Sequence, residues 1–141
     1  NRWHQEKAWR RVRFIVSDGD GDLQHLLEAA RRDIPFILHA HGDNEVAWQT
    51  LLERLAEHVP PIVLTHQTPE NIPGMYNPGG FTDGDRAVCI ALALGAKAEN
   101  LYLAGFRIDK IGKWTGSTIP SRKMKKLEWM ATILNQMGVK W

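Results

Sequence analysis

Three stretches of this sequence place carboxylates, histidines and glycines in loops, and two of these loops directly follow apolar runs. The apolar residues 12–16 lead into an Asp-Gly-Asp-Gly-Asp loop at 18–22, and residues 35–38 lead into His-Ala-His-Gly-Asp-Asn at 39–44. A third loop, at 79–86, reads Gly-Gly-Phe-Thr-Asp-Gly-Asp-Arg. In an open α/β sheet, loops that follow strands converge at one edge, where ligands bind. Acidic groups gathered there repel one another unless a cation lies between them, so the pattern predicts a metal-dependent site.

The rest of the chain alternates short apolar runs with helical spacing of apolar residues. The apolar runs predict four strands: 12–17, 36–39, 62–65 and 101–104. The helical spacing predicts four helices: 23–32, 44–59, 82–94 and 121–137. Asn44 and Thr82 are the expected N-caps, and Gly95 is an expected C-terminal stop. Strands that alternate with helices are typical of parallel βαβ units. We therefore predict an α/β fold: a single doubly wound, mostly parallel sheet flanked by helices.

Length and composition indicate one ordinary globular domain. The chain has 141 residues, of which 43% are hydrophobic and 24% charged, so we expect a single catalytic domain over residues 1–141. No apolar run is long enough to span a bilayer, no secretory signal is visible, and the lone Cys89 cannot form an internal disulfide. These features predict a cytoplasmic protein without a membrane partner. The net charge is only +2 and no nucleic-acid motif occurs, so nucleic acid is not an expected partner either.

The first acidic loop has two interpretations. Its Asp-x-Asp-x-Asp spacing matches the start of an EF-hand, but that loop requires Gly at its sixth position and Glu at its twelfth, which are Leu23 and Ala29 here. An Asp-Gly turn in which Asp22 caps the following helix is the structural interpretation. Because the loop lies at a strand end beside two similar loops, we favour Asp18 and Asp20 as metal ligands.

The second loop offers two histidines. Alternation along an extended strand places His39 and His41 on the same side, close enough to share a metal ion or a phosphate. The beginning of this loop resembles the His-x-His-x-Asp-His signature of dinuclear metallohydrolases, with Asn44 in place of the last histidine. A metal-dependent hydrolase that uses His39, His41 and Asp43 is therefore one alternative function.

The third loop opens a helix. Thr82 can cap it, and Asp83 and Asp85 complement the positive end of the helix dipole. Gly79 and Gly80 just before them would let backbone amides approach an anion. Both interpretations can hold together, with one Asp structural and another facing a cation. Neither a Walker loop nor a Gly-x-Gly-x-x-Gly loop occurs in the sequence.

Together, the motifs at 39–44 and 79–86 resemble the archaeal type of the 6-hydroxymethyl-7,8-dihydropterin pyrophosphokinase family. Residues 18–21 are similar to that family's Asp-Leu-Asp-Gly motif, with Gly19 in place of Leu. The resemblance covers nearly the whole chain and implies a Rossmann-like fold similar to the catalytic domain of thiamin pyrophosphokinase. It also implies diphosphate transfer from ATP to the hydroxymethyl group of a reduced pterin, with Mg²⁺, releasing AMP for folate-type cofactor biosynthesis. Family members usually extend further at the amino end, which leaves open whether an upstream segment is missing here.

Attack of a hydroxyl on the β-phosphorus requires neutralised phosphate charge and aligned reactants. We expect Asp18, Asp20 and Asp83 to act in catalysis as Mg²⁺ ligands, with Asp85 as a further ligand and His41 as a catalytic side chain. The residues expected to bind ATP or pterin are His39, Asp43, Asn44, Gly79, Gly80, Thr82, Arg86, Arg107 and Lys113. A non-catalytic nucleotide- or pterin-binding remnant is the second alternative, and a homodimer is left open.

Overall fold

The structure is a computed structural model, and it describes residues 2–111 and 119–141. The chain divides into two compact units. The first unit contains the residues up to 66 together with 71–76, and the second contains residues 67–70 and 77–141. Each unit has its own apolar core. The single catalytic domain expected over residues 1–141 stays a prediction.

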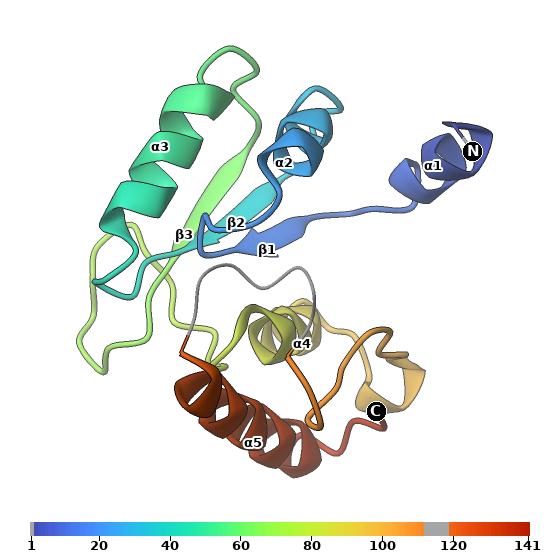
Figure 1. The fold of residues 1–141 in the computed structure, drawn as a ribbon, viewed down its shortest axis with the longest axis vertical. Coiled ribbons are helices and arrows are strands. Elements are labelled where there is room, and N and C mark those ends of the chain that lie inside the picture. The colour runs from blue at the N-terminus through green and yellow to red at the C-terminus, as the bar shows by residue number, and fades with distance from the viewer. Residues whose placement is uncertain (1, 112–118) are drawn as a thin grey trace. The chain divides into compact units, whose positions relative to one another are not determined.

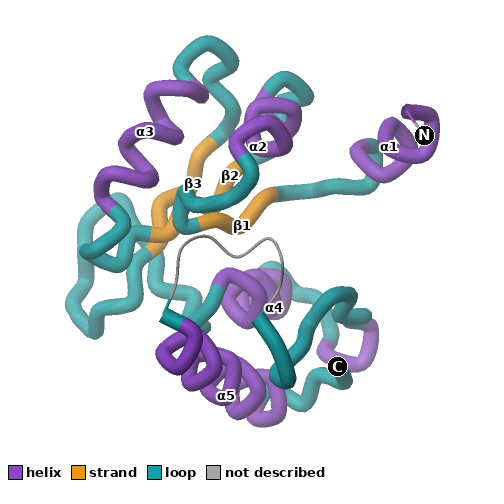
Figure 2. Tube along the Cα trace, viewed as in Figure 1, coloured by secondary structure: helices purple, strands orange, loops and turns teal. Residues whose placement is uncertain are grey.

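A small parallel sheet forms the centre of the first unit. Its strands β1 (Ile15–Ser17), β2 (Phe36–His39) and β3 (Ile62–Thr65) pair in the order β1-β2-β3 (Figure 1). Helix α2 (Leu23–Ala30) connects β1 to β2, and helix α3 (Glu45–Leu55) connects β2 to β3. Figure 2 shows the strands side by side, joined through these helices. The predicted α/β class with parallel strands is confirmed, and β2 and β3 have the predicted bounds.

Side chains from α2, β2 and α3 build the core of this unit. Phe36 and Leu38 alternate with Ile37 and His39 along β2, so they share one face of the sheet. The buried residues of the cluster are Leu26, Ala29, Ala30, Ile34, Phe36, Leu38, Leu51 and Leu55. Burying one Leu or Phe side chain fully contributes about 1.5–3 kcal/mol. Both connecting helices lie on the same side of the sheet (Figure 1). A doubly wound sheet carries helices on both faces, and the described part of this unit has them on one.

The region before the sheet differs from the prediction. A helix that was not expected, α1 (Arg2–Trp9), begins the chain, and its Trp9 packs against the core cluster. The strand predicted from residue 12 starts only at Ile15, because the Val12 amide donates to the Trp9 carbonyl (3.1 Å) instead of to a strand. The first hydrogen bond to the neighbouring strand segment is donated by the Ile15 amide to the Pro35 carbonyl (2.9 Å). Pro35 has no N–H to extend the ladder in return.

The helices of the first unit end earlier than predicted. α2 stops at Ala30, and Asp33 beyond it has a φ of 56°, outside the helical region. α3 stops at Leu55 rather than continuing to the proline pair at 60–61, and Val59 has a φ of 40°. The spacing of apolar residues within 44–59 predicts a buried stripe that includes Val46, Leu51, Leu55 and Val59, but Val46 and Val59 are 77% and 78% exposed. Leu51 and Leu55 of that stripe are buried as predicted.

The second unit is built from α4 (Asp83–Ala93), a 3₁₀ turn at Ala98–Asn100 and α5 (Pro120–Gln136). The buried residues of its core are Val88, Leu127, Met130, Leu134 and Val139. Gly95, with a φ of 93°, follows the end of α4 and confirms the predicted stop. None of the helices in the described residues has the length and apolar character needed to cross a lipid bilayer.

The strand predicted over residues 101–104 is wrong. Leu101 and Leu103 are partly buried against the core of the second unit, while Tyr102 between them is 94% exposed. This alternation is that of an extended segment with one face on the core. Within residues 2–111 and 119–141 the segment has no strand beside it, and a strand requires a hydrogen-bonded neighbour.

Candidate active site

In the first unit, the loops that follow β1 and β2 lie at the same edge of the sheet. The strands are parallel, and Ser17 at the end of β1 pairs with Leu38 near the end of β2. The acidic loop at 18–22 and the histidine loop at 40–44 therefore leave the sheet side by side. Asp22, the last acid of the first loop, caps α2 by accepting a bond from the His25 amide (3.1 Å). This confirms the predicted cap and separates Asp22 from the candidate ligands.

Asn44 ties the two loops together. Its side-chain amide donates to the Asp18 carbonyl (2.8 Å) and to the His39 carbonyl (2.6 Å), and its Oδ1 accepts from the His41 amide (3.0 Å). Asn44 is buried, and it occupies the predicted N-cap position of α3 without a side-chain bond to that helix. Because both of its N–H groups are bound to the main chain, the geometry favours a positioning role over the expected ligand contact.

His41 lies between two carboxylates. Its Nδ1 is hydrogen-bonded to Asp43 Oδ1, and its Nε2 is 3.4 Å from Asp18 Oδ2. The Asp20 amide lies 3.4 Å from Asp18 Oδ1, within the same loop. Burial by itself would raise the pKa of the Asp18 carboxyl, but the hydrogen bonds from Asp20 and His41 and the charge of His41 together hold that pKa below its ordinary value. Asp18 is therefore an anion at neutral pH, next to a ring that orients it.

His39 has a structural environment. It is fully buried, and its Nδ1 lies 3.1 Å from Thr65 Oγ1, which in turn donates to the Leu38 carbonyl (3.3 Å). These bonds link β2 to β3. The ring of His39 lies 5.8 Å from that of His41, so the two histidines are neighbours, as predicted. Only His41 is partly exposed, which argues against a ligand shared by the pair.

In the second unit, the two acids at the start of α4 differ. Asp85 is fully buried, and its carboxylate accepts bonds from the Phe81 amide (2.6 Å), the Thr82 amide (2.7 Å) and the Thr82 hydroxyl (2.5 Å). The carboxylate therefore caps the helix, which leaves Asp85 poorly placed for the metal role expected of it. The Asp83 side chain is 37% exposed and 3.2 Å from the Arg86 guanidinium.

Arg86 is not placed to meet a ligand directly. Its side chain is 3% exposed and bonded to Asp83, so it holds that carboxylate rather than reaching solvent. Gly80 packs against the backbone of Arg86, and a Cβ at position 80 would lie 2.5 Å from Arg86 Cα. The φ of Gly80 is 87°. The close approach to α4 explains this glycine without an anion. A Cβ at Gly79 would make ordinary contact with Cys89 Sγ at 3.6 Å, but its φ of 86° also favours glycine.

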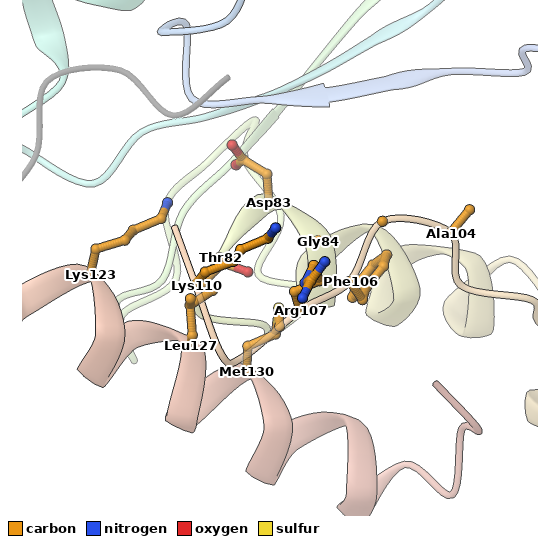
Figure 3. A pocket seen from close by; sticks show the side chains of 11 residues that line it. Thr82, Asp83, Gly84, Ala104, Phe106, Arg107, Lys110, Lys123, Leu127 and Met130 are labelled. Carbon is orange, nitrogen blue, oxygen red and sulfur yellow. The ribbon is translucent and has the colours of Figure 1, made fainter. Parts of the chain in front are cut away.

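A cavity of about 290 Å³ lies within the second unit, between the start of α4, residues 104–110 and α5. Figure 3 shows the side chains around it: Thr82 just before α4, Asp83 from the first turn of α4, Arg107 and Lys110 from the loop, and Lys123 from α5. Arg107 was an expected site residue and lines the cavity. Lys113, the other expected cation of this loop, lies outside the described residues.

Three archaeal proteins named 6-hydroxymethyl-7,8-dihydropterin pyrophosphokinase are similar to this chain. The protein of Pyrococcus furiosus is 38% identical over 127 residues, which cover 85% of this chain and 51% of the relative. That of Methanocaldococcus jannaschii is 37% identical over 139 residues, or 88% of this chain and 54% of the relative. The resemblance predicted from the motifs is confirmed.

The pyrophosphokinase of Methanothermobacter thermautotrophicus is 38% identical over 100 residues, 70% of this chain and 39% of its own length. The chain thus spans about half the length of the first two pyrophosphokinases that it matches, and less of the third. No protein-family model matches the chain, and no solved structure matches it.

Acidic side chains in each unit offer oxygen atoms of the kind that Mg²⁺ binds. Mg²⁺ prefers oxygen ligands and usually keeps several waters, with one or two protein carboxylates. Asp18 and Asp20 of the first unit offer such oxygens, and the lowered pKa of Asp18 keeps its carboxyl ionised. Asp83 of the second unit is partly exposed and held by Arg86. Within the second unit, Asp83 is better placed to meet a cation than Asp85, which is fully buried.

Lys123 was missed as a site residue, and Lys110 was not among the side chains expected to bind ATP or pterin. Lys110 lies between Arg107 and Lys113, which were both expected to bind ATP or pterin, and Lys123 lies in the first turn of α5. Both fall in runs of basic residues, which are usually solvated helix faces or loops. The signal that separates Lys123 from its neighbours is its spacing to Leu127 and Met130, which line the same cavity.

Proposed function

We propose that this chain carries out 6-hydroxymethyl-7,8-dihydropterin pyrophosphokinase chemistry, in which ATP donates diphosphate to the hydroxymethyl group of the reduced pterin. The observation that carries the proposal is the similarity to proteins of that name over 85% and 88% of the chain. The arrangement around Asp18 supports it, because an ionised carboxylate oriented by His41 is what a metal-assisted phosphoryl transfer requires.

In this reaction the hydroxymethyl oxygen attacks the β-phosphorus of ATP and forms a new P–O bond. The bond from the β-phosphorus to the oxygen bridging it to the α-phosphate breaks, and AMP leaves with that oxygen. The hydroxyl proton passes to solvent or to a nearby base. A bound Mg²⁺ would neutralise part of the phosphate charge. We propose Asp18, Asp20 and Asp83 as its ligands.

The other residues have supporting roles in this proposal. Asp43 holds the His41 ring, and His41 orients the Asp18 carboxylate from the other side. Asn44 keeps the two loops at a constant separation through its main-chain bonds. Arg86 orients Asp83. We also propose that the whole fold is doubly wound and Rossmann-like, similar to the catalytic domain of thiamin pyrophosphokinase. The proposed partners are the small molecules ATP and reduced pterin.

The hydrolase alternative has less support. It requires His39, His41 and Asp43 to hold a metal together, yet His39 is fully buried and linked to Thr65 across the sheet. No observation favours a non-catalytic remnant over the enzyme.

The test is an AMP assay. The chain is incubated with ATP, Mg²⁺ and reduced hydroxymethylpterin, and both AMP and the pterin diphosphate are measured. We expect equal amounts of the two products and none without the pterin. Turnover that does not depend on ATP would favour the hydrolase, and ligand binding without AMP would favour the remnant.

The His41→Ala variant sharpens this assay. We expect turnover to fall about tenfold to a hundredfold, since a positioned group near the reacting atoms contributes effects of that order. The midpoint of thermal unfolding should change little, because His41 lies in a loop and outside the core cluster. A His41→Ala protein with the parent's turnover would contradict the proposed role.

A further inference from the structure

Three positively charged side chains line the cavity of the second unit, and the roles proposed above do not use them. It is lined by two lysines and an arginine from two separate segments, residues 104–110 and α5 (Figure 3). Its walls also include the apolar side chains of Phe106, Leu127 and Met130. These cations therefore lie beside an apolar surface, with Arg107 and Lys110 exposed and Lys123 half-buried.

The three cations are not equivalent. The Arg107 guanidinium makes two bonds to the Asp109 carboxylate, at 2.8 and 2.5 Å. The hydrogen bonds from Arg107 hold the pKa of Asp109 at about 2, so this ion pair persists at neutral pH. By contrast, within residues 2–111 and 119–141 no carboxylate lies within 4.0 Å of the amino group of Lys110 or of Lys123. The charge of Arg107 is thus paired by direct contact, whereas Lys110 acts on Asp109 only at longer range, through its charge.

The position of the two lysines indicates what they meet. They come from different segments on the walls of one cavity, which suits an anion with several charged groups rather than one carboxylate. The cavity is at the small end of the range for small-molecule sites, so it accommodates part of a nucleotide rather than all of it. An uncharged pterin ring could contact Phe106 or Met130 but gives the lysines no partner.

We infer that this cavity binds the phosphate chain of ATP, with Lys110 and Lys123, and not Arg107, as the cations that contact it. The inference rests on the proposed function, since it assigns a place to that reaction's phosphate donor. Asp83 lies at the same cavity and is oriented by Arg86. Its carboxylate disfavours a bare phosphate chain and favours one that carries a divalent cation. Binding should therefore be tighter with Mg²⁺ than without it.

The test measures binding rather than turnover. Calorimetric titrations of the full chain use ATP, inorganic tripolyphosphate and adenosine as probes, each with and without Mg²⁺. The variants are Lys110→Gln and Lys123→Gln. The matched control is Lys125→Gln, on the same helix as Lys123 but exposed and outside the cavity lining. A double variant, Arg107→Gln with Asp109→Asn, removes the ion pair without changing the net charge.

Each lysine variant should weaken binding of ATP and of tripolyphosphate about tenfold, which is typical for the loss of one charge-assisted contact. The Lys125→Gln control and the double variant should remain within about twofold of the parent, as expected for solvated or compensated charges. Adenosine should bind equally to all of them. Because the two lysines lie on different segments, loss of folding in one variant leaves the other informative.

Three results would overturn the inference: no binding of either phosphate by the parent, an equal loss in Lys125→Gln, or a parallel loss of adenosine. The two proposals can fail separately. If the parent makes AMP while Lys110→Gln and Lys123→Gln bind ATP like the parent, the cavity assignment fails and the proposed function stands. If the lysine variants lose phosphate binding while the parent makes no AMP, the phosphate site stands and the proposed reaction fails.

Discussion

The Asp-Gly-Asp sequences at 18–20 and 83–85 contain the same residues in different environments. In the first, Asp18 contacts His41 and stays partly accessible, and Asp20 is exposed. In the second, Asp85 is fully buried and accepts two main-chain N–H bonds and a hydroxyl bond at the start of α4. The difference lies in where each sequence stands relative to a helix. A carboxylate in the first turn is captured by unpaired amide groups, whereas one in the loop before the cap stays available for a ligand.

The glycines of the two sequences are alike in one respect. A Cβ at Gly19 would lie 2.8 Å from the Trp48 amide nitrogen, and one at Gly84 would lie 2.9 Å from Phe106 Cε1. Each glycine therefore lets its loop or helix pack closely against another segment of its own unit. Only Gly19 also has a positive φ, of 95°.

The largest effect that would test this comparison is on stability. Asp85→Ala should lower the free energy of unfolding by about 2–4 kcal/mol, because it removes a helix cap and leaves the partly buried amides of Phe81 and Thr82 without an acceptor. Asp83→Ala, the matched change at the other acid, should cost less, about 1–2 kcal/mol, since the Asp83 carboxylate is 37% exposed while its buried partner Arg86 loses one bond. Urea unfolding of both variants measures the difference. Equal losses would mean that the two acids share the capping role.

A second test concerns the glycine of the first sequence. Gly19→Ala should destabilise the protein by about 1–3 kcal/mol, because of its positive φ and its contact with the main chain of α3. Gly21→Ala is the control, since a Cβ there meets only the flexible Leu26 side chain at 3.5 Å. It should be within about 0.5 kcal/mol of the parent, as for most surface substitutions. If thermal denaturation shows the two variants to be alike, close packing does not explain Gly19.

The smallest effect is a pH dependence that belongs to Asp18. Its pKa in the folded protein is below the ordinary 3.8, so ionised Asp18 stabilises the fold at pH values above about 4. That contribution is lost as pH falls through the lowered pKa, because the folded state then takes up the proton that the unfolded state already holds. The free energy of unfolding is measured at pH values from about 6 down to about 2. As the pH decreases, it should fall less steeply in Asp18→Asn than in the parent. The same slope in both proteins would contradict the environment described for Asp18.

Local signals account for what the sequence predicted correctly. The bounds of β2 and β3, the cap at Asp22 and the stop at Gly95 each depend on a few adjacent residues and their conformational preferences. The motifs at 39–44 and 79–86 were enough to indicate the pyrophosphokinase resemblance, because specific letters in a fixed order identify a family without knowledge of contacts.

The tertiary structure decided everything that depends on a distant neighbour. The sequence predicted that His39 and His41 share a ligand. In the structure, His39 is instead hydrogen-bonded to the Thr65 hydroxyl on the next strand and links the two strands. Residues 101–104 have the alternation of a strand and no hydrogen-bonded strand beside them among the described residues. The amide of Asn44 bonds to Asp18 across 26 positions of sequence. Periodicity and caps are properties of a short segment, whereas burial and hydrogen-bond pairing exist only once two segments meet, and the sequence of either one does not specify which residue it will meet.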